Sequence, residues 1–125
     1  MKNKAHGYRK QAELLKAMAH PTRLRILEIL AHTGECCVCH LTAVVRQRQP
    51  YVSQHLMVLR AQGLVTDRKD GVMVYYRLAD ERVAELLSLA RELLGASGEQ
   101  VPIAAIPEPP VAGCPCPVCA ALATQ

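Results

Sequence analysis

Hydrophobic residues recur at helical spacing through the first half of the chain and predict four helices. Residues 8–19 and 20–31 give two of them, with Pro21 in the first turn of the second helix and Gly34 ending it. Residues 38–45 give a short third helix, and a fourth runs to about Gln62 with Gly63 after it. Pro50 is expected to hold Gln49 outside helical geometry. The expected inward positions are Ala12, Leu15 and Ala19, with Leu14 and Met18 widening this face, and then Leu24, Leu27, Leu30, Val52, Leu56 and Leu59.

The hydrophobic period then changes from 3.6 to 2. Asp70-Gly71 is typical of a tight turn between two short strands, and residues 80–94 resume the helical pattern with Asp80 as the expected N-cap. Two helices with a tight break, followed by a two-stranded ribbon, predict a mainly α winged helix-turn-helix with a β-hairpin. We expect one domain over residues 1–95. Residues 96–125 hold most of the prolines and predict a semi-rigid, partly extended tail.

Composition limits the cellular compartment in which we expect this fold and the chemistry that we expect of its cysteines. Half of the 125 residues are hydrophobic, yet no apolar run is long enough to cross a membrane, and the N-terminus lacks the apolar stretch of a secretion signal. We therefore expect a cytoplasmic protein, in which thiols are kept reduced. Six cysteines then indicate metal binding or redox chemistry more than a disulfide framework. The net charge of +4 permits an anionic partner.

A winged helix-turn-helix reads DNA with the second helix of the pair, whose N-terminal residues enter the major groove. Amides and hydroxyls there can contact base edges or phosphates, whereas cations set position and salt dependence. The residues expected to face DNA on this helix are Gln49, Tyr51, Ser53, Gln54 and His55. The cations expected nearby are Arg46, Arg48 and Arg60, with Arg68 and Lys69 at the tip of the wing.

Three stretches, "LLKAMAHPTRLRILEIL", "YVSQHLMVLRAQGLV" and "RKDGVMVYYRL", resemble the ArsR/SmtB family of metal-responsive bacterial repressors. The resemblance extends from residue 10 to about residue 95 and leaves the tail uncovered. It implies a homodimer formed through the first and last helices and bound to double-stranded operator DNA. It also implies release from DNA when a metal ion or another inducer binds, and no enzymatic activity.

The resemblance also bears on the cysteines. Many relatives carry a Glu-Leu-Cys-Val-Cys-Asp-Leu stretch, and residues 35–41 match it, so Cys37 and Cys39 inherit the role of metal ligands. Cys36 replaces the leucine and His40 replaces the aspartate; His40 is the weaker candidate ligand. The third ligand stays open, and the candidates are Cys36 and the tail cysteines Cys114, Cys116 and Cys119.

Backbone geometry limits which thiols can share an ion. At a spacing of two residues, Cys37 and Cys39 point apart on a regular helix but to the same side of an extended segment. They can share an ion only if the start of the helix is unwound. Cys36 and Cys39 would instead meet on an intact helix. Either choice could tilt the neighbouring DNA-reading helices.

The sequence therefore predicts a dimeric repressor released by a thiophilic ion, with As(III) favoured over cadmium and lead, and Sb(III) or zinc as further candidates. The alternative is a redox or reactive-sulfur sensor on the same fold. A small thiol reductase using Cys116 and Cys119 is weaker, because no βαβ pattern surrounds them. A metal-storage protein that binds no operator also remains open. A zinc or nickel site on the last helix is not expected, because no histidine follows His55.

Overall fold

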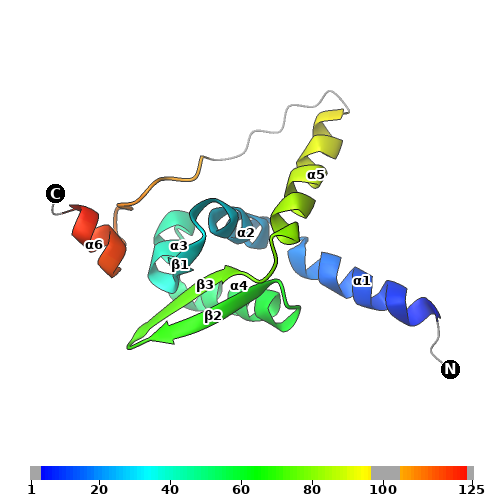
Figure 1. Ribbon diagram of the computed structural model, residues 1–125, viewed down its shortest axis with the longest axis horizontal. Helices are drawn as coiled ribbons and strands as arrows, with labels where there is room; N and C mark the ends of the chain where they lie inside the picture. The colour runs from blue at the N-terminus through cyan, green and yellow to red at the C-terminus, as the bar shows by residue number, and fades with distance from the viewer. Residues whose placement is uncertain (1–3, 97–104, 124–125) are drawn as a thin grey trace.

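The computed structural model describes residues 4–96 and 105–123 (Figure 1). Over these residues the chain forms six helices and one three-stranded sheet, and no described helix is long and apolar enough to span a membrane. The helices are α1 (Lys4–Met18), α2 (Pro21–Thr33), α3 (Val38–Val45), α4 (Gln49–Ala61), α5 (Arg82–Ala96) and α6 (Pro117–Ala123). The strands are β1 (Glu35–Cys37), β2 (Val65–Asp70) and β3 (Met73–Leu78).

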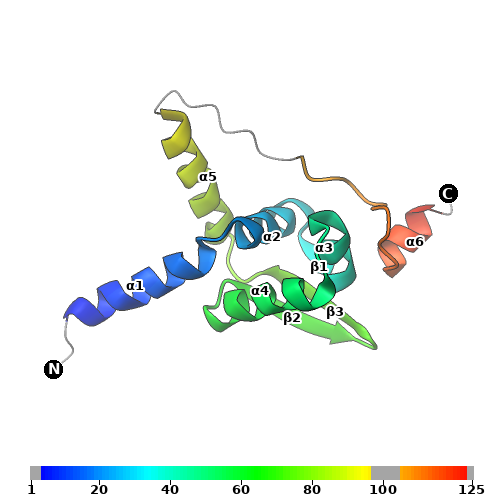
Figure 2. The ribbon, with the colours of Figure 1, turned by 180° about the vertical axis from the view of Figure 1, so that it is seen from behind.

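The core lies between the helices α2, α3 and α4 and one face of the sheet. The predicted inward positions of α4, Val52, Leu56 and Leu59, are fully buried there, as are Leu27 and Leu30 of α2. Since α3 and α4 pack against each other and against α2, the helix-turn-helix is fixed as one unit. The predicted winged helix-turn-helix is therefore the observed fold, and Figure 2 shows its hairpin beside α4.

Helix ends follow local chemistry. The ring Nδ1 of His20 accepts the backbone N–H of Thr22 at 3.1 Å and caps α2, and Gly34 ends this helix with φ +86°, a conformation that favours glycine. One prediction was wrong: Gln49 is the first residue of α4, and the extended residue before it is Arg48. Pro50 fits the first helical turn because its missing N–H would have no partner there.

The sheet contains one strand more than predicted. The Asp70-Gly71 hairpin is confirmed, with Asp70 opposite Met73 and Gly71 at φ +59°. The additional strand β1 pairs antiparallel with β3, so that the order is β1-β3-β2. Its three residues connect the end of α2 to the start of α3, in the segment that we had interpreted as a helix start.

The helices α1 and α5 project from the body (Figures 1 and 2). Apolar side chains on both helices are exposed. In α1 the buried residues are Ala17 and Met18, whereas the expected inward residues Ala12, Leu15 and Ala19 are exposed; Leu24 of α2 is exposed as well. In α5 Val83 and Leu87 are buried, and the helix starts where Asp80 accepts the backbone N–H of Arg82 at 2.8 Å.

The tail is more structured than the sequence indicated. The domain was expected to end at residue 95, and α5 ends at Ala96; residues 97–104, where the tail begins, lie outside the described residues. Residues 105–116 have no regular structure, but α6 follows them and lies on the side of β1 and α3 (Figures 1 and 2). The sequence predicted a semi-rigid, partly extended tail, and the helix α6 is an element that this prediction did not include.

The burial of Leu56 predicts its contribution to stability. Leu56→Ala should lower the free energy of unfolding by about 2–5 kcal/mol, because the lost side chain leaves a cavity in the core. Met57→Ala is the matched control on the same helix: Met57 is 68% exposed, so the change should be small. Urea denaturation of both variants measures the difference, and equal losses would contradict the packing described here.

Candidate functional site

The thiols at the junction of β1 and α3 point in different directions. Successive side chains alternate sides along a strand, so Cys36 enters the main core while Cys37 faces the tail. Cys37 is extended (φ −72°, ψ 160°) and its Sγ accepts the backbone N–H of His40 at 3.2 Å, which caps α3. The unwound helix start that would let Cys37 and Cys39 act together is therefore present.

The tail brings three further thiols to this junction. Sulfur atoms of Cys37, Cys39, Cys114 and Cys116 lie within 4.8 Å of one another. A second group, His40 with Cys114, Cys116 and Cys119, meets the same limit and shares two cysteines with the first. A small cavity between β1, α3 and the tail is lined by Cys37, His40 and Cys116, among others.

Cys36 belongs to neither of these groups. It is buried in the core, and burial raises the pKa of its thiol, so it is a poor source of thiolate. The structure thus joins five of the six candidate cysteines and leaves out the one that lies on the opposite side of β1. A packing role suits Cys36 better than a ligand role.

Cys37 and Cys39 are paired as a disulfide in this structure, with their Cα atoms 5.4 Å apart. The other described cysteines are free thiols. The two sulfurs can therefore reach each other from the same side of the extended junction. To bind an ion, this pair must be in the dithiol form.

The tail thiols influence one another's ionisation. Burial raises the pKa of Cys114 to about 12. Burial also acts to raise the pKa of Cys116, but the backbone N–H of Cys119 and the neighbouring thiols donate hydrogen bonds that hold this pKa below its usual value. Cys116 therefore ionises before Cys114, and Cys114 keeps its proton unless a positive charge enters the group.

His40 is the residue that the sequence undervalued. Its ring is 4% exposed, and its Nδ1 lies 3.4 Å from the Cys119 sulfur and 3.9 Å from that of Cys114. Burial lowers its pKa, so the ring is neutral and its nitrogen is free to bind a metal. In the sequence, only its position next to Cys39 indicated a role in ion binding. The groups that its ring faces, Cys114 and Cys119, come from the tail and are brought there by the fold.

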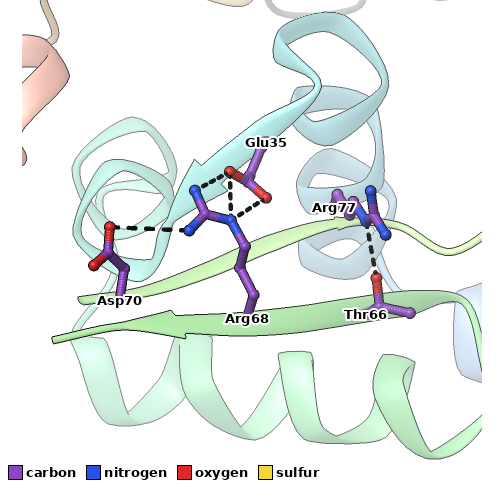
Figure 3. Close-up of polar contacts among 5 residues, drawn as sticks. All are labelled: Glu35, Thr66, Arg68, Asp70 and Arg77. Atoms are coloured by element: carbon purple, nitrogen blue, oxygen red, sulfur yellow. Dashed lines mark hydrogen bonds and ion pairs between the residues drawn. The ribbon is translucent and has the colours of Figure 1, made fainter. Parts of the chain in front are cut away.

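The sheet connects the thiol junction to the wing (Figure 3). Arg68 of β2 reaches over the ring of Tyr75, at 4.5 Å, and forms a bidentate ion pair with Glu35 of β1. This pairing lowers the pKa of Glu35. Cys37 of β1 pairs with Tyr75 of β3, and Arg68 of β2 pairs with the same residue. The strand β3 therefore lies between the thiol junction and the other strand of the wing. The Glu35–Arg68 pair could not be predicted from the sequence, because the two residues lie 33 positions apart.

Most residues expected to face DNA lie on one exposed surface of α4. Gln49, Tyr51 and Gln54 are exposed and Ser53 is half-buried; Arg60 and Lys69 are exposed as well. Two cations are already paired within the protein, Arg60 with Asp67 at 3.3 Å and Arg68 with Glu35. Lys69 has no ion pair among the described residues, so its charge is the more available one at the wing.

His55 does not fit the expectation of DNA contact. It is buried, Arg23 donates a hydrogen bond to its Nδ1 at 2.9 Å, and its ring contacts those of His20 and Tyr51. The reason is spacing: position 55 falls on the same helical face as the core residues Val52, Leu56 and Leu59. His55 therefore anchors the start of α4 against α2.

Comparisons with known proteins agree with this architecture. The family described as "Bacterial regulatory protein, arsR family" matches residues 20–67. An uncharacterised HTH-type transcriptional regulator of Methanocaldococcus jannaschii is 43% identical over 69% of this chain and 97% of its own length. The arsenical resistance operon repressor of Escherichia coli is 48% identical over 54% of this chain, but the match spans only 57% of that repressor.

Among solved structures, a homodimeric winged helix-turn-helix DNA-binding domain from Mycobacterium bovis matches with a TM-score of 0.70 and 30% identity. The match covers 82% of this chain and 96% of that domain, which is described as a possible ArsR-family transcriptional regulator. Both the sequence and the backbone of the winged helix thus have close counterparts.

The buried His55 predicts a pH dependence of stability. Burial, followed by the nearby His20 and Arg23, lowers its pKa below the usual 6.5. The folded state therefore resists protonation, and stability that is complete above about pH 6.5 should fall as the pH drops further, because the unfolded chain takes up the proton more readily. His55→Gln, which keeps an acceptor for Arg23, should reduce this fall.

Urea denaturation on both sides of pH 6.5 measures the effect. The control is His6→Gln, since His6 is exposed at the far end of α1. An unchanged pH dependence in His55→Gln would show that His55 does not contribute.

Proposed function

The chain belongs to the arsR family of bacterial regulatory proteins, and on this basis we propose that it is a transcriptional repressor that leaves its operator when a thiophilic ion binds its thiols. The observation that carries the proposal is the meeting of Cys37 and Cys39 with Cys114 and Cys116 within 4.8 Å. Thiols gathered in this number provide a soft ligand set next to the helix-turn-helix.

The DNA-binding part of the proposal rests on the exposed surface of α4. Gln49 and Gln54 offer amides that suit the paired donor and acceptor of adenine in the major groove. Tyr51 and Ser53 can hold phosphates or base edges, and Lys69 can follow the backbone from the wing. His55 is left out of this set because it is buried.

Dimerisation is proposed through α1 and α5. Both project from the body with apolar residues in solvent, among them Tyr8 (77% exposed), Leu89 (55%) and Leu93 (76%). Apolar residues on two adjacent projecting helices indicate an interaction surface. A second copy of this chain is the partner that we assign to it, as in the homodimeric M. bovis domain. Two copies would present two α4 helices to an operator of dyad symmetry.

The ion that fits best is arsenite. Cys37 and Cys39 supply two thiolates, and Cys114 or Cys116 supplies a third from the tail. Three sulfurs suit As(III) or Sb(III), whereas all four suit cadmium or zinc, with lead as a further thiophilic candidate. The required approach of the sulfurs is roughly 4 Å, close to the observed arrangement, so only small movements are needed.

The position of Cys37 suggests how ion binding reaches DNA. It is the last residue of β1 and the N-cap of α3, and it stands opposite Tyr75 in the wing. Drawing its sulfur toward the tail would shift α3, which packs on α4, and β3, which carries the wing. A tenfold to hundredfold loss of operator affinity needs a coupling of roughly 1.4–2.8 kcal/mol, which a shift of one helix start can supply.

The disulfide between Cys37 and Cys39 favours a second candidate, a redox or reactive-sulfur switch on the same fold. Oxidation would link the two sulfurs at the same junction and could move the same elements. Peroxide or polysulfide should then release operator DNA without any ion, and a thiol reductant should restore binding. A metal titration of the reduced protein separates the two candidates, because only ion capture gives thiolate–metal absorption.

One prediction of the proposed function concerns the thiol pair Cys37 and Cys39. Replacing Cys37 and Cys39 together by Ser should leave operator affinity within about threefold of the natural chain but abolish release by arsenite, because the two principal ligands are missing. Cys36→Ser is the matched control, since Cys36 lies outside both groups. Fluorescence anisotropy of labelled operator DNA, selected from random sequences by the purified protein, gives both affinities. Retained release by arsenite in the double variant would refute the assignment.

A second prediction separates base contacts from phosphate contacts. Gln54→Ala should weaken binding to the selected operator by about 1–3 kcal/mol and reduce discrimination against altered sites, because a bidentate base contact is lost. Lys69→Ala should instead lower the slope of log affinity against log salt by about one, since one phosphate contact is lost. Titrations at several salt concentrations measure both. The interface is misplaced if neither variant changes binding.

A further inference from the structure

We propose that His40, Cys114, Cys116 and Cys119 form a second ion site, of the kind that holds zinc, which fastens the tail to α3. The proposal deepens the function proposed above and rests on it for the role of the neighbouring pair Cys37 and Cys39. The two roles differ: the pair detects the inducer, whereas this group holds a resident ion that keeps the tail in place.

The geometry fits a four-coordinate ion. The Nδ1 of His40 lies 3.4 Å from the Cys119 sulfur and 3.9 Å from the Cys114 sulfur, and all four ligand atoms lie within 4.8 Å of one another. Bonds of roughly 2.0–2.3 Å in a tetrahedron separate ligand atoms by roughly 3.3–3.8 Å. The group therefore needs to contract only slightly, and three cysteines with one histidine are a common structural zinc set.

Burial identifies the site as closed. The exposed fractions are 4% for His40, 3% for Cys116 and 1% for Cys119, so there is little room for a water or a substrate as a further ligand. The Nε2 of His40 is buried and has no hydrogen-bond partner among the described residues, while its Nδ1 faces only sulfur. A neutral imidazole that binds an ion through Nδ1 carries its proton on Nε2, so Nδ1 is the atom that is available to a metal here.

Outside the cysteines, the described tail contacts the body through the ion pair of Glu108 with His32 and through Ile106 and Val111, which pack against the core. α6 has seven residues, too few to be stable alone, and its apolar residues Val118 and Leu122 are 54% and 38% exposed. The small cluster beneath it consists of Cys37, Cys116 and Cys119, with a few half-buried neighbours. The position of α6 therefore depends chiefly on the cysteines themselves. Three ligands within six residues, stiffened by Pro115 and Pro117, lose little entropy on closing around an ion.

The ion would offset most of the negative charge of the ligands and leave a net charge of about −1. On binding zinc the three thiols release three protons to solvent and His40 stays neutral, so the ion's two positive charges face three negative ones. Cys114 and Cys116 are shared with the inducer group, and a thiolate sulfur keeps lone pairs that can bind a second ion. Occupation of this site therefore leaves Cys37 and Cys39 free for the inducer.

The test uses the reduced, metal-free full chain with zinc alone or cobalt alone. Competition with a chromogenic chelator gives the zinc affinity, and Co²⁺ gives tetrahedral bands with sulfur charge-transfer absorption. Cys119→Ser and His40→Gln should each weaken zinc binding by roughly a hundredfold or more, because each ligand carries about a quarter of the binding free energy. Cys36→Ser and the double replacement of Cys37 and Cys39 should bind zinc as the natural chain does.

Limited proteolysis followed by mass spectrometry provides a readout of the tail. Zinc should slow cleavage within residues 105–123 in the natural chain and in Cys36→Ser, but not in Cys119→Ser. Equal zinc affinity in Cys119→Ser and the natural chain would overturn the proposal, as would loss of the cobalt bands in the double replacement alone.

Failure of this proposal is distinguishable from failure of the function proposed above. If zinc does not bind to this group but arsenite still releases the operator through Cys37 and Cys39, only the second site is lost. If zinc binds as expected but arsenite has no effect on operator binding, the site stands as a structural clamp and the inducer assignment fails.

Discussion

The pairing of three residues, Glu35–Cys37, with strand β3 is the constraint on which the rest of the site depends. It keeps Cys37 extended where a helix would otherwise begin, so that successive cysteines face opposite sides of β1. Cys36 then fills the core, and Cys37 caps α3 and faces the tail. If α3 began two residues earlier, the side chains of Cys37 and Cys39 would point to different sides of the helix. The tail cysteines could then not approach both of them together.

The sequence was sufficient for the elements that rely on local signals. The period of α4 and the Asp70-Gly71 turn placed the helix-turn-helix and the wing correctly, because one buried face and one turn type determine them. The strand β1 was missed because it is only three residues long and is held by β3, far away in sequence. The burial of His55 could have been found, since it lies three residues after Val52 and four before Leu59 on one helical face.

The site itself was only partly predictable. The family stretch pointed to Cys37 and Cys39, but no local pattern could bring Cys114, Cys116 and Cys119 to them, because a proline-rich tail has no periodicity that fixes its path. The same limit applies to Arg68. From sequence it is a cation at the tip of a wing, whereas in the fold its guanidinium is held by Glu35 and the ring of Tyr75. Part of the positive charge near the proposed DNA-binding surface is thus already neutralised within the protein.

The thiol cluster gathers the sulfur ligands of the two ion sites that we propose. At the start of α6 the backbone N–H of Cys119 donates to the Cys116 sulfur, and this donor helps to hold the pKa of the Cys116 thiol below its usual value. Burial and neighbouring sulfur oppose further ionisation, as the raised pKa of Cys114 shows. Gathering several thiolates in this space is unfavourable by itself, because like charges repel strongly where water is excluded. The soft cation of the proposed function would remove this penalty at Cys37, the residue that joins the strand, the helix pair and the tail.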